Sequence, residues 1–218
     1  SDLIGVSGGA ERIAIETANA LFHNGHRVTF VCCHGLAGEP FYALDPQIPL
    51  IDLNTDPYGW YYRDLGADLR LDFDALTQQD FPLLDYQPTR EDFLAWCKSG
   101  HLRRSQAYHG FFREHHFDVV ISHMPSTFPY VLLARPNDDQ ALHIACLHSS
   151  PVFKFYSDEY PNSGRFDQYI RLASLERADR ISILFETYRA QMPPPYRAKC
   201  FELPNFIRTL PAESRTPA

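Results

Sequence analysis

The stretch GVSGGAERIAIETANALFHNGHRVTF, residues 5–30, decides the fold class of this chain. Two adjacent glycines, Gly8 and Gly9, precede a segment in which apolar residues recur at helical spacing. Asn24-Gly25 then supplies a helix stop, and residues 28–32 form a β-branched and aromatic run typical of a buried parallel strand. The stretch therefore predicts a glycine turn, an amphipathic helix and a buried strand in succession.

The two glycines raise the question of what lies beside them. A helix N-terminus presents unpaired backbone N–H groups, and residues without side chains let a phosphate approach those groups. A tight turn into a helix needs glycines as well, and the GxGxxG pattern of dinucleotide sites is absent from this stretch. The local sequence leaves both interpretations open.

The rest of the chain continues the alternation of strands and helices. A short strand is predicted at residues 48–53, an irregular stretch at 54–88, and a helical segment at 89–116 with Thr89 as its cap. Further strands are predicted at residues 117–122, 141–148, 180–185 and 200–206. This pattern predicts an α/β fold, a Rossmann-like parallel sheet with helices on both faces.

The expected domain covers residues 1–210, and residues 211–218 resemble a tail or linker. A glycine turn that leads into a helix normally follows a strand, yet only Asp2-Leu3-Ile4 precedes it here. We therefore expect a few hydrophobic residues to precede Ser1 in the natural chain.

Composition narrows the class of protein. A formal net charge of −7 argues against a general nucleic-acid surface, and no apolar stretch approaches the length of a membrane span. Five cysteines without CxxC spacing are expected to be reduced thiols in a cytoplasmic protein, with Cys32 and Cys33 on opposite faces of a strand. A peripheral contact with the inner face of a membrane stays open.

Ligands of open parallel sheets bind where the strands end, so the residues after each strand are the candidates. His148 ends one strand and can hydrogen-bond a ligand hydroxyl or a backbone group, with the structural role favoured on the residues alone. His123 follows another, where a structural role is preferred and Ser126 is the expected helix cap. Glu11 and Arg12 fit a surface ion pair as well as a ligand contact. No metal site is predicted, because His115-His116 lacks partners at ligand spacing.

A family resemblance rests on five motifs. GGAERIAIETANALFHNGHRVTFV, FDVVISHMPS, IACLHSS, LERADRISILFETYR and FELPNFI occur in this order and resemble the N-terminal domain of GT-B glycosyltransferases of glycosyltransferase family 4. The resemblance implies retaining transfer from a nucleotide-diphosphate sugar to a glycan or lipid-linked acceptor, without a metal or other cofactor. It implies that Gly8 and Gly9 lie near the donor diphosphate and that His148 faces the reacting sugar.

The resemblance covers the acceptor-side half of the GT-B fold, and nothing in the sequence resembles the family's C-terminal nucleotide-sugar domain. Donor binding is therefore expected from a further domain in cis or from a partner subunit, and we expect residues 1–218 alone to be inactive. Synthesis of a cell-surface polysaccharide or glycoconjugate is expected by analogy. Tyr58 and Trp60, whose faces can stack on sugar rings, and Ser149 are the acceptor candidates.

Three other functions stay open at this point. The first is a separate, non-catalytic subunit that recruits an acceptor or a membrane for a catalytic partner chain. The second is a Rossmann-like domain for another phosphorylated ligand. The third and weakest is a hydrolase with Ser149 as nucleophile, because the chain lacks the GxSxG turn.

Overall fold

A computed structural model describes residues 8–35, 38–63, 69–157 and 164–205. All strand pairs in this part of the chain are parallel. One sheet has the order β3–β4–β5–β6, formed by β3 (Val119–His123), β4 (Leu142–Cys146), β5 (Arg180–Ile183) and β6 (Cys200–Glu202). A second sheet pairs β1 (Phe30–Cys32) with β2 (Leu50–Asp52). The predicted parallel α/β fold is confirmed, although the described strands form two sheets rather than one, and the expected first strand at residues 2–4 lies outside the described residues.

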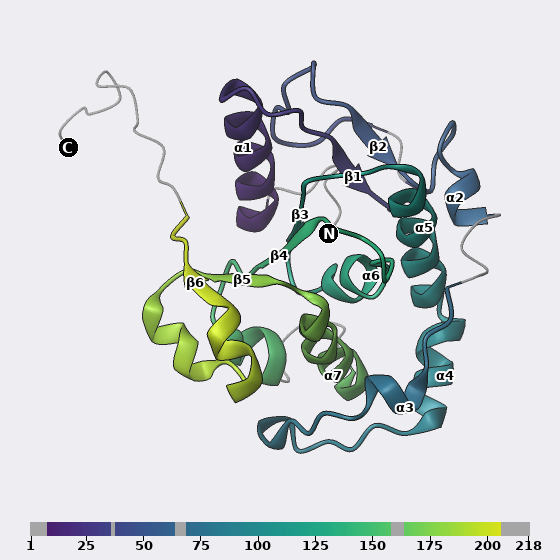
Figure 1. Cartoon of the computed structure of the whole chain (residues 1–218), viewed down its shortest axis with the longest axis vertical. Coiled ribbons are helices and arrows are strands. Elements are labelled where there is room, and N and C mark those ends of the chain that lie inside the picture. The colour runs from purple at the N-terminus through teal and green to yellow at the C-terminus, as the bar shows by residue number, and fades with distance from the viewer. Residues whose placement is uncertain (1–7, 36–37, 64–68, 158–163, 206–218) are drawn as a thin grey trace.

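Helices cover both sides of the line of strands (Figure 1). On one side lies α1 (Gly9–His23), and on the other lie α5 (His101–Glu114), α6 (Phe128–Leu132) and α7 (Arg165–Ser174). The remaining helical elements are α2 (Trp60–Arg63), α3 (Phe73–Leu76), α4 (Arg90–Lys98), the 3-10 turns η1 (Pro82–Leu84), η3 (Leu175–Arg177), η4 (Glu186–Gln191) and η5 (Pro194–Lys199), and the π-turn η2 (Val152–Tyr156). The layers are those expected of a Rossmann-like domain.

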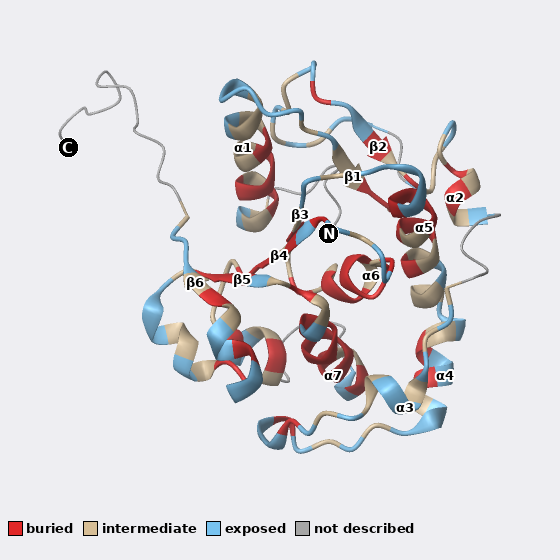
Figure 2. Ribbon diagram, in the orientation of Figure 1, coloured by how far each residue is buried: buried red, intermediate tan, exposed pale blue. Residues whose placement is uncertain are grey.

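The largest core cluster lies where β4 and β5 meet α7. Ile181 and Ile183 of β5 are fully buried, as is Leu172 of α7. A second cluster joins α5 to the β1–β2 sheet through Phe111 and Leu53. Buried positions follow the inward faces of α5, α6 and α7 in Figure 2, which is the pattern that the apolar periodicity of these helices predicts.

The predicted helix at 89–116 is two helices, α4 and α5. Thr89 caps α4 as predicted, because its side chain accepts a hydrogen bond from the Asp92 N–H while the Asp92 carboxylate accepts from the Thr89 N–H. Gly100 has φ of 91°, a left-handed conformation that ends one helix and begins the next. Gly110, by contrast, lies inside α5 without interrupting it.

Cys32 and Cys33 are both buried but face different clusters. Cys32 packs in the cluster of Ile15 from α1, whereas Cys33 packs in the cluster that contains Tyr108 of α5. The predicted opposite orientation is therefore confirmed. Burial raises the pKa of each thiol to about 12, with the Asp52 carboxylate adding to the shift. Both are free cysteines in the thiol form at neutral pH.

The end of α6 is tied to the sheet by Arg135. Its guanidinium donates to the Asp179 carboxylate at 2.9 Å, to the Arg177 carbonyl at 3.1 Å and to the Ala141 carbonyl at 3.0 Å. The same Asp179 carboxylate accepts the backbone N–H of His143 in β4. One side chain thus joins the segments that precede β4 and β5.

Candidate functional site

Two histidines meet at the carboxyl ends of neighbouring strands. His123 is the last residue of β3, and His148 follows β4 by two residues. Their rings are nearly parallel, 5° apart, with Nδ1 of His123 2.9 Å from Nε2 of His148. The parallel register that places His123 opposite Cys146 brings both strand ends to the same edge.

The turn after His123 is sharp. Met124 has φ of 74°, an uncommon conformation for a residue with a side chain. The Thr127 hydroxyl lies within hydrogen-bond distance of the carbonyls of both His123 and Met124 and supports the turn. The prediction that Ser126 caps the following helix is wrong, because α6 begins at Phe128 and Thr127 occupies the cap position.

Asn205 joins the pair from the end of β6. Its Oδ1 lies 3.2 Å from Nδ1 of His148, so both ring nitrogens of His148 have a protein partner. Ser149, the next residue along the chain, has a buried hydroxyl without a hydrogen-bond partner among the described residues. Residues 123, 148 and 205 come from three different strand ends, so the arrangement depends on the sheet.

The side chain of Glu11 lies beside Gly8, the first of the two adjacent glycines. Its side chain folds back over Gly8, and a Cβ added to Gly8 would lie 1.8 Å from Glu11 Oε2. Gly9 has no atom within 4 Å of such a Cβ. Glu11 is 7% exposed and Arg12 approaches Glu16 at 4.0 Å, so of the two accounts that the sequence left open, the structure does not show the surface ion pair of Glu11 with Arg12. The Glu11 carboxylate therefore lies beside Gly8.

Alanine substitutions separate the roles of the two glycines. We expect Gly8→Ala to lower the free energy of unfolding by about 1 kcal/mol, because the new methyl group displaces the buried Glu11 carboxylate. Gly9→Ala is the matched control and should be neutral or stabilise by about 0.5 kcal/mol, since it adds helix propensity in open space. Urea unfolding of both variants measures the difference, and equal effects would contradict the assignment of Gly8 to the Glu11 contact.

Both imidazoles of the pair are neutral at pH 7. Burial lowers the pKa of His123 from 6.5 to about 3, and the neighbouring His148 adds to this shift. Burial also lowers the pKa of His148, with Lys154 adding to the shift while the Asn205 hydrogen bond and the Glu11 carboxylate oppose it. The pair is therefore a set of neutral hydrogen-bonding groups rather than a cation.

Because the histidine pKa values are lowered in the folded protein, the free energy of unfolding decreases as the pH falls below about 6.5. Unfolded histidine titrates near 6.5, so below that pH the unfolded chain binds protons that folded His123 excludes. We expect the free energy of unfolding to drop by about 2 kcal/mol between pH 7 and pH 5 on this account. Urea unfolding at both pH values should show a smaller drop for His123→Phe than for the wild type; equal drops would contradict the prediction.

Two of the acceptor candidates from the sequence, Tyr58 and Trp60, lie in a different part of the structure from the third, Ser149. Tyr58 and Trp60 pack with the cluster of α5, and the ring of Trp60 stacks on Tyr61 with centroids 3.9 Å apart. The hydroxyl of Tyr61 donates to the Glu114 carboxylate at 2.6 Å. The structure thus gives these aromatic residues packing partners, and it brings neither of them into hydrogen-bond contact with the described residues of the histidine pair.

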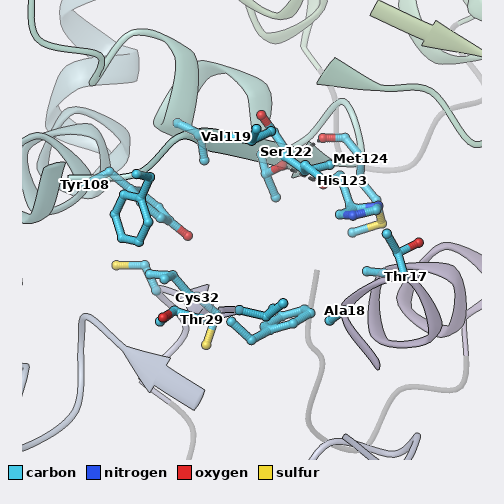
Figure 3. A pocket seen from close by; sticks show the side chains of 18 of the residues that line it. Thr17, Ala18, Thr29, Cys32, Tyr108, Val119, Ser122, His123 and Met124 are labelled. Carbon is cyan, nitrogen blue, oxygen red and sulfur yellow. Dashed lines mark hydrogen bonds between the residues drawn. The ribbon is translucent and has the colours of Figure 1, made fainter. Parts of the chain in front are cut away.

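A pocket of about 690 Å³ lies between the two sheets, with α1 along one side (Figure 3). Thr29 and Cys32 line it from the β1 side, and Val119, Ser122 and His123 from the β3 side. Within the described residues, β1 pairs with β2 alone and β3 with β4 alone, so both facing strand edges are unpaired. Such edges are suited to another strand. The part of the pocket that concerns the site is the wall formed by His123.

Comparison with known proteins identifies the family. A profile of the glycosyl transferase 4-like domain matches residues 8–196. The chain belongs to this family. The chain is also similar to an uncharacterized glycosyltransferase of Haemophilus influenzae, with 36% identity over 78 residues. The match covers 32% of this chain and 22% of that protein, so the chain spans less than a quarter of the relative's length in this match.

The sequence indicates His148 as a candidate site residue, favours a structural role for His123 and assigns no role to Asn205. His123 directly follows the predicted strand at residues 117–122 and Asn205 lies near the end of the one predicted at 200–206, and this position was the available signal. Glu11 also carried a signal, because a glutamate three residues into a helix can fold back on the N-cap residue, here Gly8. The described residues do not include a helix long and apolar enough to cross a membrane.

Proposed function

We propose that this glycosyl transferase 4-like domain, residues 1–210, is the acceptor-side half of a retaining glycosyltransferase. The enzyme would move a hexosyl or similar unit from a nucleotide-diphosphate sugar to a glycan or lipid-linked acceptor, in the synthesis of a cell-surface polysaccharide or glycoconjugate. It would act in the cytoplasm or at the inner face of a membrane, without a metal or other cofactor. Family membership supports glycosyl transfer, and the neutral hydrogen-bonding cluster of His123, His148 and Asn205 at the strand ends carries the assignment of the site.

Each group has a role in this proposal. The bond between the anomeric carbon and the diphosphate breaks, the diphosphate oxygen keeps the electron pair and takes the acceptor's hydroxyl proton, and the acceptor oxygen bonds to the anomeric carbon on the same face. The histidine pair holds hydroxyl groups of the reacting sugar, and its neutrality suits that task because neutral imidazoles both donate and accept hydrogen bonds. Gly8 and Gly9 lie at the diphosphate, which requires the Glu11 carboxylate to move aside, because two anions at one helix N-terminus repel each other.

The donor half belongs to a C-terminal domain in cis or to a partner subunit. Tyr58, Trp60 and Ser149 stay the acceptor candidates of this proposal, and the unpartnered hydroxyl of Ser149 favours a polar ligand beside His148. Truncating Trp60 to alanine should weaken acceptor binding if the aromatic cluster reaches the acceptor. Unchanged binding by a folded variant would restrict that cluster to packing on α5.

The test is an assay of the native polypeptide, purified from its source, with radiolabelled UDP-, GDP- and ADP-sugars and membranes of that source as acceptor. Transfer of label with retention of the anomeric configuration, read by NMR of the product, is the expected result. Residues 1–218 expressed alone should show negligible transfer, and appreciable turnover by them would overturn the division into halves. Absence of transfer by the native protein would favour the non-catalytic subunit instead.

A further inference from the structure

The histidine pair contains four ring nitrogens, and three of them have protein partners. Nδ1 of His148 faces Asn205 Oδ1, and Nε2 of His148 faces Nδ1 of His123. Nε2 of His123 is the fourth, and no side chain or backbone group of the described residues hydrogen-bonds it. The ring nitrogen left for a ligand therefore belongs to His123 and not to His148.

Counting protons assigns a direction to the bonds. The Asn205 oxygen accepts, so Nδ1 of His148 carries its proton and Nε2 of His148 carries a lone pair. Nδ1 of His123 must then donate to that lone pair, which leaves a lone pair on Nε2 of His123. If the Asn205 side-chain amide is rotated by 180°, its nitrogen donates to Nδ1 of His148. The two hydrogen bonds of the series His123–His148–Asn205 then reverse direction, and Nε2 of His123 carries a proton instead. The free nitrogen is the same in both cases.

The position of the His123 ring makes this nitrogen accessible. His123 lines the wall of the pocket on the side of α1, where Figure 3 places it near Thr17 and Met124. The unusual backbone of Met124 turns the chain away directly after the ring. The hydrogen bond between Nδ1 of His123 and Nε2 of His148 fixes the orientation of the His123 ring, which lies within 5° of parallel to the His148 ring. Asn205 in turn holds the His148 ring. A fixed ring with one open nitrogen has the geometry of a hydroxyl-binding group.

We propose that His123 hydrogen-bonds a hydroxyl group of the bound sugar through Nε2, and that His148 and Asn205 are the residues that position its ring. A hydroxyl can donate or accept, so it matches either proton arrangement of the series. The inference rests on the proposed function, which supplies the sugar. It assigns the contact with the ligand to His123, and His148 acts on the ligand only by positioning the His123 ring.

Two substitutions of His123 separate binding from positioning. A glutamine amide reaches the place of Nε2, whereas an asparagine amide reaches only the place of Nδ1 and keeps the bond to His148. In the transfer assay of the native enzyme, we expect His123→Gln to keep kcat/KM within about threefold of the wild type and His123→Asn to lose about tenfold, the value of one neutral hydrogen bond. Equal losses, or better activity of His123→Asn, would overturn the proposal.

A second experiment does not depend on sugar transfer. Diethyl pyrocarbonate acylates accessible imidazole nitrogens that carry a lone pair, and peptide mass spectrometry locates the product. With the Asn205 oxygen as acceptor, Nε2 of His123 carries a lone pair, so on the chain of residues 1–218 we expect His123 to react well before His148, and His148 to become reactive in the His123→Phe variant. Faster reaction of His148 in the wild type would overturn the assignment of the free nitrogen. Because this readout needs no donor or acceptor, it separates failure of this inference from failure of the proposed function.

Discussion

His148→Ala is expected to lower kcat/KM for sugar transfer by about tenfold, because the contact that His148 positions has the value of one neutral hydrogen bond. The substitution removes the central ring of the series, so Nδ1 of His123 and the Asn205 amide both lose their partner. The His123 ring is then free to rotate away from the ligand. Initial-rate kinetics of the native enzyme, with saturating acceptor, measure the change.

A matched control comes from a histidine outside the site. His23 lies at the end of α1 with a side chain that is 64% exposed, where it pairs with Asp45 at the surface. His23→Ala should leave kcat/KM within about twofold of the wild type, because exposed pairs contribute little. Circular dichroism of both variants verifies folding. A loss of less than about fivefold for folded His148→Ala would place this residue outside the reaction.

Arg135→Ala is expected to lower the free energy of unfolding by about 3 kcal/mol, the largest effect on stability that we predict. The guanidinium is 18% exposed and bonds the Asp179 carboxylate together with the carbonyls of Arg177 and Ala141. Its removal takes a donor from both carbonyls and leaves the Asp179 carboxylate with the His143 N–H but without its ion-pair partner. Urea unfolding at pH 7 measures the loss through the transition midpoint and slope.

Arg90→Ala is the control for the loss of an arginine charge. Arg90 approaches Asp74 at 3.5 Å, but these side chains are 67% and 79% exposed, so the pair is expected to contribute less than about 0.5 kcal/mol. If Arg135→Ala lowered the free energy of unfolding no more than Arg90→Ala does, the hydrogen bonds of Arg135 would not be a source of stability.

The order of elements could be predicted from the sequence because the signals are local. The β-branched and apolar runs at residues 117–122 and 141–148 became β3 and β4, and the capping pair of Thr89 and Asp92 marked the start of α4. Element ends were less predictable, since a strand ends where its neighbour stops pairing with it. β6, for instance, ends at Glu202, although the predicted strand continues to residue 206.

The site could be predicted only in part, because its contacts join residues that are distant in the sequence. His123 and His148 are 25 positions apart, and Asn205 is a further 57 positions along the chain. Strand ends indicated the edge at which they lie, but the ring orientations depend on the register of β3 and β4. The fold of Glu11 over Gly8 depends on a single rotamer, which helical periodicity does not specify.

The order of strands in the larger sheet has a consequence for how the chain folds. β3, β4 and β5 each pair with the next strand along the sequence, so this sheet can form from one continuous segment through helical crossover connections. The β1–β2 pair is marginal by itself and depends on packing against α5, which comes later in the chain. In pulsed hydrogen exchange during refolding, we expect amides of β4 and β5 to become protected before those of β1 and β2.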